Sequence, residues 1–403
     1  MLRKIPLHWQ ILIGIILGVI FGIFLKPIVP YLSVLGILFI RALKMIVVPL
    51  IMSSLIIGVT NIQQGSTLGR IGIKTLVYYL STSILAILTG LFLVNIVKPG
   101  VGANIDFSGI TATTLEEPSL KDTIINIVPD NIFQAISSAD MLAIIFFSLL
   151  LGVFITKLEA TKRQLLTNIF DAVFEVMMKI TLFVIRFAPI GVMGIVVDVV
   201  SVQENLPELM IRLGKFALVV VVGLAFHLLI TLPLILYFIG KVNPVKHYKA
   251  LLNVFLTAFS TASSNATLPL TIETIEEKSG VSNRIASFTL PLGATINMDG
   301  TALYELVVAG FIAQALGYDL SLAQQFVLVT TALLASIGTA GVPMASFVTM
   351  TIIFTSVGLP IEAMFFVMPI DRPLDMLRTA TNVMSDTCGA VIIARSEKEK
   401  LHY

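Results

Sequence analysis

Charged side chains are scarce in this chain. They make up 12 % of its 403 residues, about half of the roughly 25 % found in soluble domains. The net charge of +2 at pH 7 leaves no basic surface for nucleic acid. Hydrophobic residues reach 57 %, and the mean hydropathy is +0.98. These values exclude a cytosolic globular enzyme and a disordered protein, and they indicate an all-α polytopic membrane protein.

Side chains that form disulfides or bind metals are equally scarce. The single cysteine, Cys388, excludes an internal disulfide framework and a cysteine-rich metal site. The four histidines, His8, His227, His247 and His402, lie far apart in the sequence. None has the helical spacing of a zinc enzyme. We therefore expect no cofactor.

Long apolar runs mark the membrane-spanning helices, which need about 20 residues each. Six such runs lie near residues 10–30, 33–62, 71–97, 139–156, 165–188 and 209–240. Lysine and arginine collect in the second, fourth and sixth connections and in the C-terminal tail, which predicts that both termini are cytoplasmic. The long polar connection near 98–138 then faces outside. It carries no N-glycosylation sequon, which favours a prokaryotic cell (inner) membrane.

The pattern changes in the second half of the chain. A short apolar run at 248–259 meets a Ser/Thr/Asn cluster at 260–267 and continues to about 278. Another short run, 322–335, breaks at 336–343 and resumes at 347–357. Segments this short are typical of re-entrant hairpins. Paired, interrupted segments of this kind indicate the repeats and the binding site of a secondary transporter. Two kinked helices in a structural bundle are the alternative.

One full-length helix follows each predicted hairpin, near 284–316 and 361–394. At about 100° per residue, five polar residues of the last helix share an arc of about 80°. They are Asp371, Asp375, Arg378, Asn382 and Asp386. Arg372 lies off this face and is expected to reach toward water. Three carboxylates then oppose one guanidinium, which predicts a bound cation. A purely structural Asp375–Arg378 pair is the alternative.

The other full-length helix carries polar residues in the middle of an apolar run. Asn297, Asp299 and Gly300 are poor helix formers, so a local break is expected whose carbonyl oxygens coordinate an ion. Glu305 follows in the same run. Burial disfavours the ionised form of a carboxyl group, so Glu305 could carry a proton. The alternative is a neutral, hydrogen-bonded carboxyl group with no role in transport.

Three sequence motifs carry a resemblance to a known family. They are N-M-D-G-T-A-L-Y at 297–304, A-S-I-G-T-A-G-V-P at 335–343 and L-D-M-L-R-T-A-T-N-V at 374–383. A fourth segment, L-K-M-I-V-V-P-L at 43–50, is similar too. Together they resemble the glutamate transporter family. These dicarboxylate/amino acid:cation symporters include the excitatory amino acid transporters and the archaeal aspartate transporters.

The resemblance implies a homotrimer of elevator-type transporters with eight spanning helices, two re-entrant hairpins and inverted repeats. Scaffold helices one and two would occupy 1–70, and transport-domain helix three 71–98. The external loop and scaffold helices four and five would occupy 99–200, and the transport-domain core 201–403. The second hairpin would be the gate.

The same resemblance assigns roles to individual residues. Asp375 would hold the substrate's ammonium group and Arg378 its side-chain carboxylate. The remaining substrate contacts would be Ser263, Ser264, Thr301, Val342, Thr379 and Asn382. Three sodium sites are implied, the first formed by Gly293, Asn297, Asn382 and Asp386. The second comprises Thr295, Ser336, Ile337 and Thr339, and the third Tyr79, Thr82, Ser83, Asn297 and Asp299.

The chain departs from the archaeal pattern in the first hairpin and at Glu305. Ala262 stands where archaeal members have arginine, and Asn265 replaces a serine, so the contacts of the first hairpin are less defined. Glu305 stands where archaeal members have glutamine and animal members have glutamate. The animal members couple transport to protons and counter-transport potassium, which implies proton coupling here and leaves potassium open.

We therefore expect a sodium-coupled symporter of glutamate, aspartate or both. A symporter of C4-dicarboxylates or of neutral amino acids is the main alternative, although Asp375 disfavours the first and Arg378 the second. A membrane enzyme is disfavoured because Ser263 and Ser264 have no histidine nearby in the sequence. A channel activity would be additional to transport.

Overall fold

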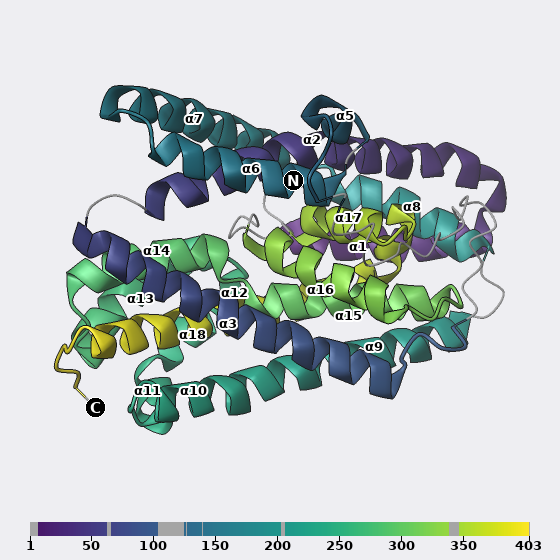
Figure 1. Ribbon diagram of the computed structural model, residues 1–403. Helices are drawn as coiled ribbons and strands as arrows, with labels where there is room; N and C mark the ends of the chain where they lie inside the picture. The colour runs from purple at the N-terminus through teal and green to yellow at the C-terminus, as the bar shows by residue number, and fades with distance from the viewer. Residues whose placement is uncertain are drawn as a thin grey trace.

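The computed structural model describes residues 7–62, 66–103, 125, 127–138, 140–202, 206–337 and 346–402. Within these residues all regular structure is helical and no strand occurs, which confirms the all-α prediction. Helices α6 and α7 run along one side of the molecule and α9 and α10 along the other (Figure 1). Helices α15 and α18 lie between them.

The first half of the chain forms seven described helices. They are α1 (Leu7–Phe24), α2 (Val29–Ile62), α3 (Ser66–Val97), α5 (Ile132–Ser138), α6 (Met141–Thr156), α7 (Ala160–Ile185) and α8 (Ala188–Val202). The sequence analysis missed α8 and treated its residues as a connection. At 15 residues this helix falls below the length of a spanning run. It is bent by 56° from α7 and packs against α1 and α2.

The second half is more broken. Its helices are α9 (Leu206–Phe226), α10 (Leu232–Phe238), α11 (Pro244–Ala250), α12 (Leu252–Thr261), α13 (Ser264–Thr274), α14 (Asn283–Ile296), α15 (Asp299–Ala315), α16 (Leu322–Ile337), α17 (Ser346–Ser356) and α18 (Met368–Ser396). The last helix was predicted to begin near 361. A 3₁₀ helix at Ile361–Val367 precedes it instead. The polar face of α18 therefore begins closer to the N-terminus of the helix than the sequence predicted.

A π-helical turn, His227–Thr231, joins α9 to α10. Pro233 follows directly and has no N–H to donate to the residue four positions before it. The N–H of Leu232 donates to the carbonyl of His227, five residues back. The turn therefore shifts the helix register at His227, a residue with a buried side chain.

Several helices have the length and surface of membrane spans. Within the described ranges, four qualify by length and composition, or five if α7 and α8 form one bent span. Large apolar side chains on α3 and α9 face outward, including Phe92, Ile73 and Leu218. Exposed apolar surface on this scale requires a lipid environment. The chain is an integral membrane protein, and the count of eight spans stays a prediction.

Helix α15 is the buried centre of the bundle. Every side chain from Asp299 to Ala313 is buried. The helix packs against α3, α9, α16, α17 and α18. A helix of this kind contacts protein on all sides, so its polar residues face other helices rather than lipid.

Both predicted hairpins contain two helices that pack against one another, α12 with α13 and α16 with α17. The first break is shorter than expected. Ala262 adopts a left-handed conformation with φ of +48°, and the hydroxyl of Ser263 caps α13 by accepting the N–H of Ala266. Residues 264–267 are therefore helical. The turn of the second hairpin, 338–345, lies outside the described residues.

The C-terminal end of α18 is tied to α3. Glu397 accepts hydrogen bonds from Arg70 at 2.5 Å and from Lys74 at 2.7 Å. These two bonds lower the pKa of Glu397 to about 2. The carboxylate therefore stays ionised at neutral pH, and the attachment would weaken only as pH falls below about 4.5 toward 2. Helices α3 and α18, which both contribute to the site below, are held in register by this contact.

We expect substitution of Gly194 by valine to destabilise the packing of α8 on α2. A side chain at Gly194 would meet the carbonyl oxygen of Leu32 and, at 2.6 Å, the backbone nitrogen of Gly36. Overpacking of this kind costs about 1–3 kcal/mol, which thermal unfolding in detergent would detect as a lower midpoint. Gly214→Ala is the control, because a side chain there meets nothing within 4 Å. Equal midpoints for both variants would contradict the expectation.

Candidate substrate and cation site

The polar face of α18 forms two connected groups of side chains. The arginine cluster comprises Asp371, Arg372, Asp375 and Arg378. The carboxylate network comprises Asn297, Asp299, Ser385 and Asp386. Both are built on α18 and completed by α15, whose N-terminus begins at the break after α14. Residues far apart in sequence therefore meet in the interior of the bundle.

Arg378 is the centre of the arginine cluster. Its side chain is only 1 % exposed. One terminal nitrogen, Nη2, lies 2.9 Å from Oδ1 of Asp375, and Nη1 lies 3.1 Å from Oδ1 of Asp371. Nη2 also lies 3.3 Å from Oγ of Ser346 on α17, and the guanidinium stacks 3.8 Å from the ring centre of Tyr304. A buried guanidinium requires this much pairing.

Arg372 also belongs to this cluster, contrary to the expectation that it reaches toward water. Its Nη1 lies 3.1 Å from Oδ2 of Asp375. The wheel placed Arg372 off the polar face because it follows Cα directions, whereas a long side chain reaches a residue three positions on. Two guanidiniums therefore neutralise Asp371 and Asp375, and the predicted shortage of cations does not arise here.

Asn382 joins α18 to the N-terminus of α15. Its Oδ1 accepts the N–H of Gly300 at 2.7 Å, and its Nδ2 donates to Oγ1 of Thr301 at 3.1 Å. The first N–H groups of a helix have no partner within that helix and attract anions. Thr301 and Asn382, two predicted substrate contacts, are thus brought together, and Arg378 and Thr379 are buried on the same helix as Asn382.

The carboxylate network holds the two remaining acidic side chains of the site. Asp299 accepts from Ser83 on Oδ1 at 2.6 Å and from Ser385 on Oδ2 at 2.6 Å. Asp386 accepts from Nδ2 of Asn297 at 2.9 Å. No lysine or arginine of the described residues forms an ion pair with either carboxylate. Of the three carboxylates of the last helix from which a shortage of cations was predicted, Asp386 is therefore the one without an ion-paired lysine or arginine among the described residues.

The sequence analysis missed one member of this network, Ser385, and one further partner of Asp299, His227. Nε2 of His227 lies 3.1 Å from Oδ2 of Asp299, although the two residues are 72 positions apart. Ser385 precedes Asp386 and sits at the edge of the polar face. For Ser385 the helical wheel offered a weak signal, but for His227 an apolar helix offered none.

Helix α3 supplies further oxygen atoms. Oγ1 of Thr82 lies 3.3 Å from Oδ1 of Asn297, and the hydroxyl of Tyr79 donates to the carbonyl of Thr289 at 2.8 Å. A Cβ atom at Gly293 would lie 2.5 Å from Oδ1 of Asp386 and 2.6 Å from the hydroxyl of Tyr79. Only glycine permits this approach. The structure thus brings together Tyr79, Thr82, Ser83, Gly293, Asn297, Asp299 and Asp386.

Other predicted ligands are not brought into this group. The hydroxyl of Thr295 donates to the carbonyl of Leu292 at 3.0 Å, and that of Ser336 to the carbonyl of Leu333 at 2.8 Å. Ile337 ends α16, and Thr339 and Val342 lie outside the described residues. The second sodium site therefore stays a prediction. Ser263 and Ser264 lie at the break of the first hairpin, whose helices both pack against α18.

Glu305 is fully buried in α15. Oε1 is hydrogen-bonded to the hydroxyl of Thr349 on α17, while Oε2 has no partner among the described residues. The same hydroxyl lies 3.0 Å from the carbonyl of Ser346. Glu305 thus connects the central helix to the second arm of the hairpin predicted to be the gate. Both interpretations of Glu305, proton carrier and structural carboxyl group, are compatible with this contact.

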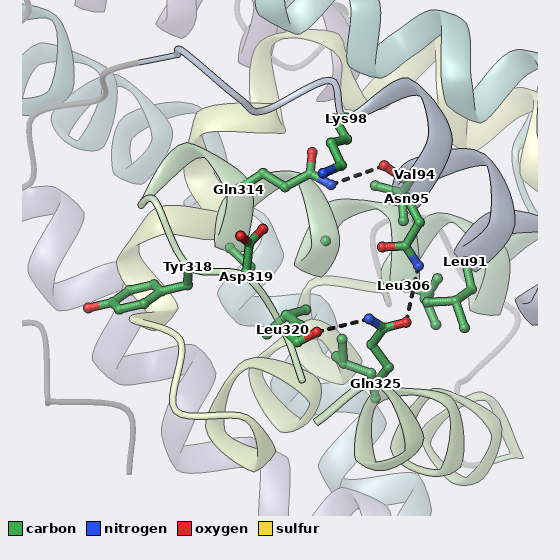
Figure 2. A pocket seen from close by; sticks show the side chains of 13 residues that line it. Leu91, Val94, Asn95, Lys98, Leu306, Gln314, Tyr318, Asp319, Leu320 and Gln325 are labelled. Carbon is green, nitrogen blue, oxygen red and sulfur yellow. Dashed lines mark hydrogen bonds between the residues drawn. The ribbon is translucent and has the colours of Figure 1, made fainter. Parts of the chain in front are cut away.

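A cavity of about 280 Å³ lies elsewhere, between α3, α15 and α16 (Figure 2). Nδ2 of Asn95 donates to Oε1 of Gln325 at 3.1 Å along its wall. Lys98 and Asp319 also line it. The cavity contains none of the predicted site residues, so it is not the predicted substrate site.

An all-helical membrane protein with paired hairpins and buried charges at its centre has the architecture of a secondary transporter. The chain belongs to the sodium:dicarboxylate symporter family, whose profile matches residues 7–396. The family resemblance read from the three motifs is thereby confirmed.

Relatives from bacteria and animals cover nearly the whole chain. The proton/sodium-glutamate symport protein of Bacillus caldotenax is 37 % identical over 98 % of this chain and 96 % of its own length. The proton/glutamate-aspartate symporter of Escherichia coli is 37 % identical over 98 % and 93 %. Excitatory amino acid transporter 3 of Mus musculus is 34 % identical over 98 % and 86 %.

Proposed function

We propose that this chain is a sodium-coupled symporter of acidic amino acids, glutamate, aspartate or both. The observation that carries this proposal is the juxtaposition of a buried arginine with an oxygen-lined network holding two carboxylates without ion-paired lysine or arginine. The names of the relatives at 34–37 % identity support the same substrate class. The protein works as a homotrimer in the cell membrane, with both termini cytoplasmic, and moves its transport domain by an elevator mechanism.

In the loaded carrier each part of the site has one task. Arg378 exchanges Asp371 and Asp375 for the side-chain carboxylate of the substrate, because bidentate Arg–carboxylate pairing is strong and directional. Asp375 binds the ammonium group. Asn382, Thr301 and the N-terminus of α15 hold the α-carboxylate. Sodium binds within the carboxylate network, where it offsets the charges of Asp299 and Asp386 and thereby favours substrate binding nearby.

Uptake into proteoliposomes tests the whole proposal. Labelled aspartate, glutamate, succinate and serine are offered with and without an inward sodium gradient. Sodium-driven accumulation of aspartate or glutamate is expected. Accumulation of succinate or serine in preference to both would favour the alternative of a C4-dicarboxylate or neutral amino acid symporter.

Substrate binding should depend on sodium through Asp386. We expect calorimetric titration to give a much higher aspartate affinity in sodium buffer than in choline buffer, because the two ligands stabilise each other reciprocally. Asp386→Asn removes one of the two charges that attract the cation and should weaken this dependence. Asp319→Asn, at an exposed carboxylate in the α15–α16 connection, should leave it unchanged. Equal wild-type affinities in the two buffers would count against the proposal.

Arg378→Cys or Arg378→Thr should abolish uptake of aspartate and glutamate. Removing one partner of a buried charge pair costs about 2 kcal/mol or more, so affinity should fall by at least about 30-fold. The space released should admit small neutral amino acids. Arg284→Cys, at an exposed position on α14, is the control. Undiminished aspartate affinity in the Arg378 variants would refute this role.

Glu305 is proposed to carry a proton during transport. We expect wild-type uptake to quicken as the outside pH falls from about 8 to 5.5, because symport consumes outside protons and a buried carboxyl group can titrate in that range. Glu305→Gln should remove this pH dependence, and any acceleration by internal potassium, while sodium-driven exchange survives. Glu277→Gln, at an exposed position, is the control. A wild-type rate indifferent to pH and potassium would make Glu305 structural.

A further inference from the structure

Asp375 has a counter-ion on each of its carboxylate oxygens in this structure. Oδ1 lies 2.9 Å from Nη2 of Arg378, and Oδ2 lies 3.1 Å from Nη1 of Arg372. In the proposed mechanism the side-chain carboxylate of the substrate pairs with Arg378 in place of Asp375. Arg372 is then the cation that remains beside Asp375, at the position where the substrate's ammonium group must bind.

The two arginines differ in how easily their side chains can move away from Asp375. The side chain of Arg378 is 1 % exposed and stacks against Tyr304. The side chain of Arg372 is 28 % exposed and forms one ion pair in the described part of the chain, with Asp375, whereas Arg378 forms two. Arg372 can therefore swing toward water when a competing cation arrives, whereas Arg378 is held by its surroundings.

We infer that Arg372 is a specificity-determining residue which competes with the substrate's ammonium group for Asp375. With an amino acid bound, the ammonium displaces Arg372 from Oδ2. With a C4-dicarboxylate bound, which has no ammonium group, Arg372 stays in place and Asp375 is not left as an unpaired buried charge. Arg372 thereby narrows the preference for aspartate over succinate. This inference rests on the proposed substrate class, and it names the residue that sets the preference between an amino acid and a dicarboxylate without an ammonium group.

The discriminating measurement is the ratio of the dissociation constants of succinate and aspartate at one fixed sodium concentration. General effects of a variant on folding or on sodium binding cancel in this ratio. Arg372→Gln removes the competing charge, so aspartate should bind more tightly and succinate more weakly. Each change is expected to reach about fivefold, as for a partly exposed ion pair, so that the ratio rises by fivefold or more.

Three comparisons make the result specific to charge. Arg372→Lys keeps a cation within reach of Asp375 and should retain a ratio near that of the wild type. Arg372→Met keeps the apolar stem and should behave like Arg372→Gln. In an Asp375→Asn background, Arg372→Gln should no longer change the ratio, because the carboxylate for which the two cations compete is gone.

An unchanged ratio in both Arg372→Gln and Arg372→Met would overturn the inference, as would a lysine variant that behaves like the glutamine variant. A wild-type protein that binds aspartate but rejects succinate completely would also overturn it, since Arg372 would then not suffice as the counter-ion of Asp375. Absence of aspartate binding in the wild type would instead refute the proposed function itself.

Discussion

The structure depends on the need to pair charges that are buried away from water. Arg378 is enclosed by protein, and an isolated guanidinium there would be costly by several kcal/mol. Its partners come from three helices. Asp371 and Asp375 lie on α18, Tyr304 lies on α15 and Ser346 on α17. The pairing therefore fixes how the last helix, the central helix and the second arm of the second hairpin pack together.

The ion pairs of Arg378 are also of a kind that an external carboxylate can exchange. Each contact that Arg378 makes with Asp371 or Asp375 is one that an external carboxylate can replace with similar geometry. Ser346 lies on the same hairpin arm as Thr349, which contacts Glu305. Arg378 and Glu305 therefore both contact the second arm of the second hairpin, each through one hydrogen bond.

The break between α14 and α15 has a second role beside the substrate site. It turns the side chains of Asn297 and Asp299 toward α18 and α3, where Ser83, Ser385 and Asp386 surround them. Gly293 permits the close approach of Asp386 and Tyr79. A helix continued through this point would satisfy its own backbone and offer no N–H to Asn382.

The sequence by itself determined the all-α class, a break near Asn297, the interruption of the first hairpin and the polar face of the last helix; the structure places the first of these breaks at 297–298. Hydropathy and helical periodicity suffice for these features, because each depends on residues close together in the chain. Family motifs predicted Thr301, Arg378 and Asn382 as contacts of one substrate site, and the structure joins Thr301 to Asn382 by a hydrogen bond. The sequence analysis missed helix α8 because it searched for apolar runs of about 20 residues, and α8 has 15 residues.

Only the tertiary structure decided which charges neutralise one another. Arg372 pairs with Asp375 because its long side chain reaches along the helix. Asp386, on the same helix, has no ion-paired lysine or arginine among the described residues. His227 meets Asp299 because α9 continues through a π-helical turn beside the break in the central helix. Contacts between residues 72 positions apart follow from how helices pack, and no local pattern encodes them.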